Sequence, residues 1–263
     1  MMNMGCIKGG NEMKPQKNYA IKINSALKQM YQAKGIEEMT KLGEELLKSK
    51  QCKEDEEFRN IVHGEICETI LECYLIDYIK RNHLEDKWFY EKGMVLKDMN
   101  NPDGEYLTEV DMTLFTPFKI LTIECKCYGG GKLLVDECKI VRKGLKPYDV
   151  FKQHAKHIET LMGNFYRFRL NNKYSSAYSP IDAAYFDFSL GKITDKRTVE
   201  WKTKMPALNI NNLYNHLDTY LDKPACWDIK GLKQGVDIIT KHKDILRKKH
   251  LKYVKGLNKK RQK

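Results

Sequence analysis

The pattern of hydrophobic and polar positions divides the chain into stretches of helical and of strand-like period. Apolar residues spaced three and four apart predict helices, and alternation or short β-branched and aromatic runs predict strands. Helices are expected over residues 19–50, 56–81, 147–169, 209–221 and 231–254. Strands are expected over residues 88–96, 109–115, 120–127, 132–135, 139–142, 183–188 and 198–201. This order predicts an α/β fold in which helices flank a sheet.

Glycine, proline and other turn residues refine these boundaries. The first helical stretch is expected to divide near residues 33–35, because glycine weakens a helix. Turn residues at 98–104 predict a hairpin, glycines at 128–131 end the third strand, and Pro147 suits the first turn of the next helix. Residues 1–17 are polar and contain paired glycines, which favours disorder.

Three charged side chains stand out in the strand-like stretch 109–126. Alternation places Asp111 on the polar face of the first strand and places Glu124 and Lys126 together on the next. If the two strands are antiparallel neighbours, Asp111 and Glu124 come within reach of one metal ion. An ordinary charged strand face with salt bridges is the competing interpretation.

These residue types suit metal-assisted hydrolysis of a phosphodiester. Mg²⁺ prefers oxygen ligands, which Asp111, Glu124 and the backbone carbonyl of Cys125 would provide; Mn²⁺ is the alternative ion. Lys126 would orient the attacking water and stabilise the charge that develops.

The helix expected at 56–81 carries a row of acids. Glu65, Glu68 and Glu72 share one side of it, because they are three and four residues apart. Such a row is usually a solvated face, but beside a metal site one member can point inward.

The chain has eight cysteines and no C-x-x-C pair. Cys125 and Cys127 could suggest zinc, but alternation places both on the strand face opposite Glu124. We therefore expect them to be small core residues, with reduced thiols.

The net charge of +12 indicates a polyanionic partner, and nucleic acid is the commonest. Much of the excess lies near the C-terminus, where Lys248, Lys249, Lys259, Lys260 and Arg261 are candidates for phosphate contacts. A solvated, fraying terminal helix is the alternative. No apolar run approaches the ~18 residues that span a bilayer, and no secretory signal is recognisable. We expect a cytoplasmic protein without a membrane partner, and leave a homodimer open.

The order of these motifs resembles the PD-(D/E)-x-K nuclease superfamily, and within it the nuclease-related domain (NERD) family. The matching residues are Val110-Asp111, Glu124-Cys125-Lys126, the segment 64–68 upstream, and the segment 146–153 downstream with His157 one turn later. Val110 stands where proline is frequent in the superfamily. The resemblance covers about residues 64–221.

The resemblance implies a restriction-endonuclease-like mixed sheet core at 56–225, with an N-terminal helical extension at 1–55 and a basic C-terminal helix and tail at 226–263. It also implies that a helix glutamate completes the acidic site; spacing favours Glu68, with Glu65 as the alternative. Gln153 matches the polar helix residue that approaches the site. His154 and His157 are expected to be structural.

The leading hypothesis is a Mg²⁺- or Mn²⁺-dependent DNA nuclease, cutting internally or from ends. The second is a nuclease fold that binds nucleic acid with little or no cleavage. A third is a partner-binding role for residues 19–50, which lie outside the resemblance.

Overall fold

The computed structural model describes residues 25–98, 107–127, 133–136, 139–141, 147–167, 181–188 and 193–261. Its helices are α1 (Ser25–Gln32), α2 (Ile36–Lys48), α3 (Lys50–Glu54), α4 (Glu56–Arg81), α5 (Val150–Arg167), α6 (Val199–Lys204), α7 (Leu213–Asp218), α8 (Ile229–Thr240) and α9 (Lys243–Arg261). Its strands are β1 (Phe89–Lys97), β2 (Leu107–Phe115), β3 (Ile120–Lys126), β4 (Leu133–Asp136), β5 (Lys139–Val141), β6 (Ile181–Asp187), β7 (Ile193–Asp195) and β8 (Ala207–Leu208).

A mixed five-stranded sheet organises the fold, in the order β1-β2-β3-β6-β8. The β1–β2 and β2–β3 pairs are antiparallel, whereas β3–β6 and β6–β8 are parallel. A smaller sheet has the order β5-β4-β7. The predicted α/β class with a mixed sheet flanked by helices is therefore confirmed.

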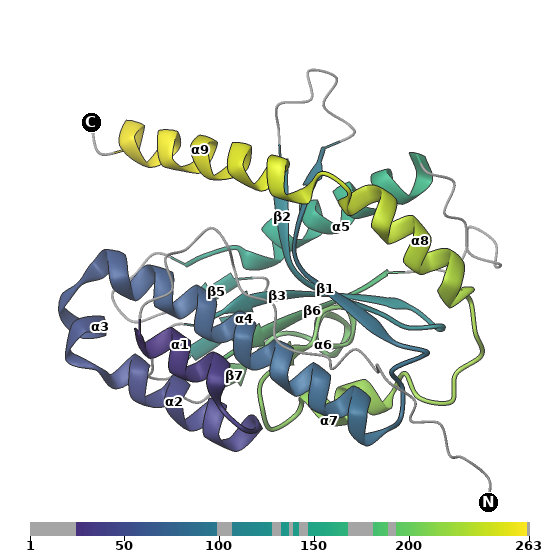
Figure 1. Cartoon of the computed structure of the whole chain (residues 1–263), viewed down its shortest axis with the longest axis horizontal. Helices are drawn as coiled ribbons and strands as arrows, with labels where there is room; N and C mark the ends of the chain where they lie inside the picture. The colour runs from purple at the N-terminus through teal and green to yellow at the C-terminus, as the bar shows by residue number, and fades with distance from the viewer. Residues whose placement is uncertain are drawn as a thin grey trace, which may run out of the picture.

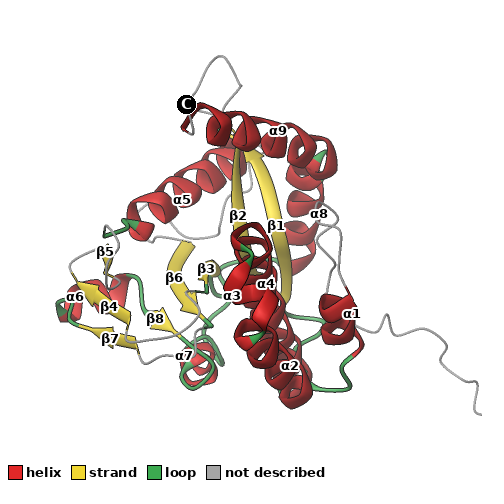
Figure 2. Ribbon diagram, turned by 90° about the vertical axis from the view of Figure 1, so that its left-hand side faces the viewer, coloured by secondary structure: helices red, strands yellow, loops and turns green. Residues whose placement is uncertain are grey.

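Helices cover both faces of the large sheet, with α4 and α5 on opposite sides of it (Figure 2). On one side, α4 buries an apolar row that includes Ile66, Ile70 and Leu71 against β2, β3 and β6. On the other side, Leu161 and Phe165 of α5 share a core cluster with β1, β2 and α8. The polar residues discussed below lie on β1, β2 and β3 and on the helices that cover these strands.

The N-terminal helices are part of the larger core. Helices α2 and α3 pack against α4 (Figure 1). Met39 and Leu47 of α2 and Cys52 of α3 are buried in the same cluster as α4. Whether these helices also bind a partner protein stays a prediction. None of the described helices has the length and apolar character needed to cross a membrane.

The basic C-terminal region folds back over the sheet. It forms α8 and α9, separated at residues 241–242, where the sequence predicted one helix. Lys243 of α9 lies 2.9 Å from Glu91 of β1, and Arg247 is paired with Glu109 of β2. Ion pairs thus attach the first turns of α9 to the strands.

Several local expectations were wrong. Residues 198–201 begin helix α6 instead of forming a strand, because the Thr198 hydroxyl caps the helix by accepting from the Trp201 amide at 3.4 Å. The helix expected at 209–221 shortens to α7, and the short strands β7 and β8 were not foreseen. Pro147 precedes α5 by three residues instead of occupying its first turn.

The division of the first helical stretch near residues 33–35 is confirmed by the boundary between α1 and α2. The expectations for residues 1–17, for the turn at 99–104 and for the glycines at 128–131 lie outside the described residues.

Candidate active site

Strands β2 and β3 bring the predicted carboxylates together. Their antiparallel register pairs Met112 with Ile123, so Asp111 and Glu124 occupy the next opposed positions. The backbone N–H of Cys125 donates to Asp111 Oδ2 at 2.8 Å, which holds this carboxylate against β3. The Cys125 and Cys127 side chains are buried in the opposite core, which confirms their predicted role.

Lys126 completes a compact group with these acids. Its Nζ atom lies 2.5 Å from Glu124 Oε1 and 3.9 Å from Asp111 Oδ2. The Glu124 side chain is 1% exposed, whereas those of Asp111 and Lys126 are 19% and 22% exposed. Glu124 is therefore an internal support, and the other two residues reach solvent.

The two carboxylates have opposite tendencies to ionise. Burial and the neighbouring Glu124 charge raise the pKa of Asp111 to about 7. Burial also disfavours the charged form of Glu124, but Lys126 and the histidines His154 and His157 hold its pKa well below the usual range. A pair in which one carboxylate stays ionised and the other is easily protonated is typical of functional sites.

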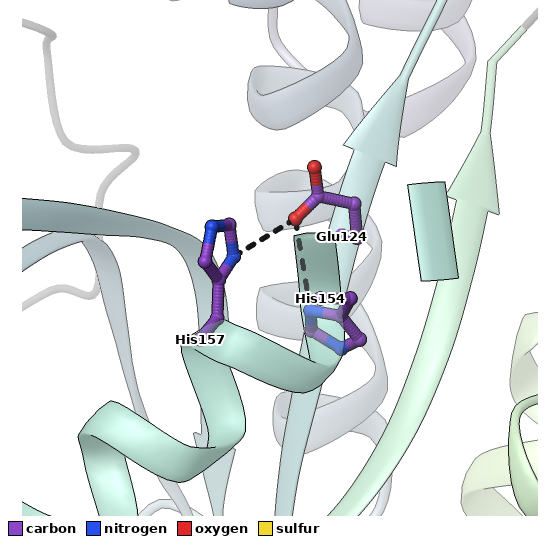
Figure 3. Close-up of side chains that lie close together, drawn as sticks. All are labelled: Glu124, His154 and His157. Atoms are coloured by element: carbon purple, nitrogen blue, oxygen red, sulfur yellow. Dashed lines mark ion pairs between the residues drawn. The ribbon is translucent and has the colours of Figure 1, made fainter. Parts of the chain in front are cut away.

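Two histidines of α5 face the inner oxygen of Glu124 (Figure 3). His157 Nδ1 lies 3.1 Å and His154 Nδ1 3.6 Å from Glu124 Oε2. Both side chains are at least 95% buried. The interpretation of these histidines as merely structural missed a contact with the central acid of the site.

The glutamates of α4 surround a lysine of β1. Lys92 Nζ lies 3.7 Å from Glu65, 3.9 Å from Glu68 and 3.4 Å from Glu72. Burial would lower the pKa of Lys92, but the three carboxylates raise it above its ordinary value. The row is therefore not a solvated face, because its three acids point inward around a buried cation.

Tyrosines complete this network at two of the three acids. Tyr31 donates to Glu65 Oε1, and Tyr90 donates to Glu72 Oε1 at 2.9 Å. The buried Oε2 atom of Glu68 has no hydrogen-bond partner among the described residues.

The pKa of Glu68, on α4, is affected by the charge of Asp111 on β2. Burial raises the pKa of its carboxyl well above the usual range; Lys92 opposes this, and the charges of Asp111, Glu65 and Glu109 add to it. Glu65 instead lies within the Lys92 and Tyr31 contacts. Glu68 as the helix acid of the site, with Glu65 as the alternative, stays a prediction.

Gln153 is linked to the site through a residue that the sequence did not single out. The hydroxyl of Tyr148, just before α5, donates to Gln153 Oε1. Burial raises the pKa of Tyr148, Lys126 opposes that shift, and the charges of Glu124 and Asp111 add to it. Tyr148 is 42% exposed, so its ring stands at the solvent side of this group.

The proposed phosphate-binding residues lie on α9. Lys248 and Lys249 are exposed. Lys259, Lys260 and Arg261 belong to the same helix, but their side chains are outside the described set.

Some of the site residues that the sequence analysis did not assign to the site could have been recognised from their positions in the chain. His154 and His157 are three residues apart on the apolar side of a predicted helix, which could have indicated a buried pair. Lys92 breaks the apolar run of a predicted strand, and a buried lysine needs acidic partners. Tyr148 gave no comparable signal.

Comparison with known families bears on the centre of the chain. Residues 69–182 match the family model described as the nuclease-related domain. The match contains Asp111, Glu124, Lys126 and Gln153, and it begins one residue after Glu68. Searches of curated proteins and of solved structures gave no match. The relationship to the nuclease-related domain that the sequence indicated is therefore confirmed, and residues 69–182 are the segment of this chain that carries it.

Proposed function

We propose that this chain hydrolyses phosphodiester bonds of nucleic acid, with DNA as the first substrate to test, using Mg²⁺ or Mn²⁺. The observation that carries the proposal is the convergence of Asp111, Glu124 and Lys126 at neighbouring positions of two antiparallel strands. These strands lie inside the segment that matches the nuclease-related domain.

The donor set fits a hard divalent cation. Asp111 and Glu124 offer carboxylate oxygens, and the Cys125 carbonyl is proposed as a further oxygen ligand. The raised pKa of Asp111 reflects repulsion by Glu124 as well as burial, and a cation between the two would relieve both. Bound there, a divalent cation supplies a nucleophile and neutralises charge at phosphorus.

Lys126 is proposed to act at the solvent side of the pair. Its contact with Glu124 Oε1 fixes the ammonium group, and its partial exposure leaves it able to meet substrate. In this position it can orient the attacking water and stabilise charge on the phosphate oxygens.

Glu68 and Gln153 are proposed as auxiliary residues on the two helices that flank this group. Glu68 adds a carboxylate beside Asp111. Gln153, held by Tyr148, adds a polar group from α5.

Helix α9 is proposed to hold the nucleic-acid backbone. Arg247 pairs with Glu109, which lies two residues from Asp111 and so projects from the same side of β2. The exposed Lys248 and Lys249 follow directly along α9 and are proposed to contact phosphates of the backbone.

Cleavage of supercoiled and linear DNA in Mg²⁺ or Mn²⁺ tests the proposal. Asp111→Ala and Lys126→Ala should each lower the rate at least about a hundredfold, since each removes a charge that acts on the reacting phosphate. Lys152→Ala, an exposed lysine on α5, is the matched control and should cut normally. Full activity in both site variants would overturn the assignment.

The second candidate function, binding without cleavage, is favoured by one observation: cations on α9 lie close to the site without being part of it. Filter binding over a range of salt should then show a steep loss of affinity. Binding by wild type and Asp111→Ala with no cutting by either would select this function.

A further inference from the structure

We propose that Glu124, His154 and His157 form a second cation site, selective for a divalent transition metal, on the α5 side of Glu124. This inference rests on the proposed function only in sharing Glu124. It concerns the oxygen of Glu124 that faces away from Lys126. Direct metal binding without nucleic acid can therefore test it separately from cleavage.

The geometry of the three side chains is that of a ligand set. Each offers one ligand atom, and these atoms lie within 4.8 Å of one another. The two histidines project from the same side of α5 because they are three residues apart, and Glu124 meets them from β3 (Figure 3).

All three ligand atoms are buried without a hydrogen-bond partner among the described residues: Glu124 Oε2, His154 Nδ1 and His157 Nδ1. Buried polar atoms are nearly always paired, because an unpaired one loses its hydration without replacement. Three such atoms converging on one point indicate that something positive belongs between them.

The tautomer of His154 sharpens this argument. Its Nε2 atom lies 3.1 Å from the backbone carbonyl of Thr122, which can only accept a hydrogen bond. The Thr122 hydroxyl, 3.3 Å from the same nitrogen, already donates to the Asp182 carbonyl. In the neutral ring Nε2 therefore carries the proton, which leaves the Nδ1 lone pair available to a cation held beside Glu124.

Metal-binding histidines are held in this way. The nitrogen that does not bind the ion donates to a backbone carbonyl, which fixes the tautomer and the ring plane. Two imidazoles and one carboxylate suit zinc, cobalt, manganese or iron in the divalent state, whereas Mg²⁺ favours an all-oxygen set. With three protein ligands, a fourth position stays open for water.

The position of Glu124 gives this site a consequence for the first one. Its Oε1 atom contacts Lys126 beside Asp111, and its Oε2 atom faces the histidines. One carboxylate thus connects an oxygen-ligated position with a nitrogen-ligated position. Loading the histidine site would orient Glu124 toward Asp111.

Titration of the full-length, metal-free protein with Co²⁺ alone tests the inference. Wild type should bind one Co²⁺ with visible absorption bands of nitrogen and oxygen ligation, and Zn²⁺ should displace it. His157→Ala should weaken Co²⁺ binding at least tenfold and lower the ratio of Co²⁺ to Mg²⁺ affinity. His83→Asn, at an exposed histidine with φ of 53°, is the matched control and should bind Co²⁺ as wild type does.

A reciprocal variant separates the two cation positions. Asp111→Asn should weaken Mg²⁺ binding more than Co²⁺ binding, the opposite of His157→Ala. If a histidine variant fails to fold, an anomalous peak between Glu124, His154 and His157 in cobalt-soaked wild-type crystals supports the site, and its absence overturns it. Absence of Co²⁺ bands, intense thiolate bands from the cysteines, or equal loss of both ions in His157→Ala would also overturn it.

Discussion

Two groups of carboxylates, each with one lysine, lie close together and differ in the number of acids and in the exposure of the lysine. Around Lys92, three glutamates of α4 face one cation, and two of them also accept tyrosine hydroxyls. Around Lys126, two acids share the cation, and the lysine reaches solvent. The side chain of Lys92 is 3% exposed and that of Lys126 22%.

The difference shows how similar residue types serve stability in one place and chemistry in the other. In the closed group, around Lys92, three glutamates depend on one buried ammonium, so removing that cation leaves carboxylates unpaired in a dry interior. The open group, around Lys126, reaches solvent, so a cation from solution can approach Asp111, whose pKa is raised by burial and by the neighbouring Glu124 charge. Glu68 is related to both groups, since it pairs with Lys92 and the charge of Asp111 helps to raise its pKa.

The largest effect should come from the closed group. Lys92→Met should lower the free energy of unfolding by about 3–5 kcal/mol, because it leaves three buried carboxylates without their cation. Urea unfolding measures this. Lys97→Met, an exposed lysine on the same strand, is the control and should change stability by no more than about 0.5 kcal/mol. Equal stability of the two variants would contradict the role of Lys92 as the cation that stabilises the buried glutamates.

In the open group, removing the lysine should affect DNA cleavage more than stability. Lys126→Met should lower DNA cleavage at least about a hundredfold, equivalent to about 2.7 kcal/mol of transition-state stabilisation. Its free energy of unfolding should fall less than that of Lys92→Met, because His154 and His157 still contact Glu124 and Lys126 was already partly solvated. Parallel cleavage and unfolding measurements decide this, and a reversed order would break the comparison.

The strand that carries Lys92 also has a glycine at the junction of the two groups. Gly93 has a φ of 61° and lies between the pairs Lys92–Met112 and Met94–Val110, opposite Asp111. Gly93→Ala should destabilise the protein by about 1–3 kcal/mol, since the φ of Gly93 lies in the left-handed region, where a Cβ adds backbone strain.

Gly64 provides the matched comparison for that variant. It lies inside α4, and nothing would lie within 4 Å of an added Cβ. Gly64→Ala should therefore stabilise the protein by about 0.5–1 kcal/mol through helix propensity. Melting temperatures that shift in the same direction for both variants would contradict the assigned role of Gly93.

A further effect depends on pH. The folded-state pKa of Asp111, about 7, lies above its unfolded-state value, so its contribution to stability is greatest at low pH and is lost as pH rises toward 7. Asp111→Asn removes that loss. Without metal, the variant should be more stable than wild type by about 1–2 kcal/mol at pH 8, and by less at pH 5.5. Unfolding in chelator at both pH values tests the sign.

The main elements of the fold could be predicted from the chain because they rest on local periodicity. The limits of α4 follow from its apolar spacing, and the adjacency of Asp111 and Glu124 follows from strand alternation once the two strands pair. Elements such as α6 and the break between α8 and α9 depend on capping and packing, which periodicity does not report.

By itself, the sequence determined the core segments α4, β1, β2, β3, α5 and β6, the relation to the nuclease-related domain, and the triad Asp111, Glu124 and Lys126. These are properties of residue order and short-range spacing. Tertiary structure alone decided that Glu65, Glu68 and Glu72 surround Lys92 and that two histidines face Glu124. Burial and pairing across distant segments set these roles, because a charge takes its chemistry from the groups that the fold places around it.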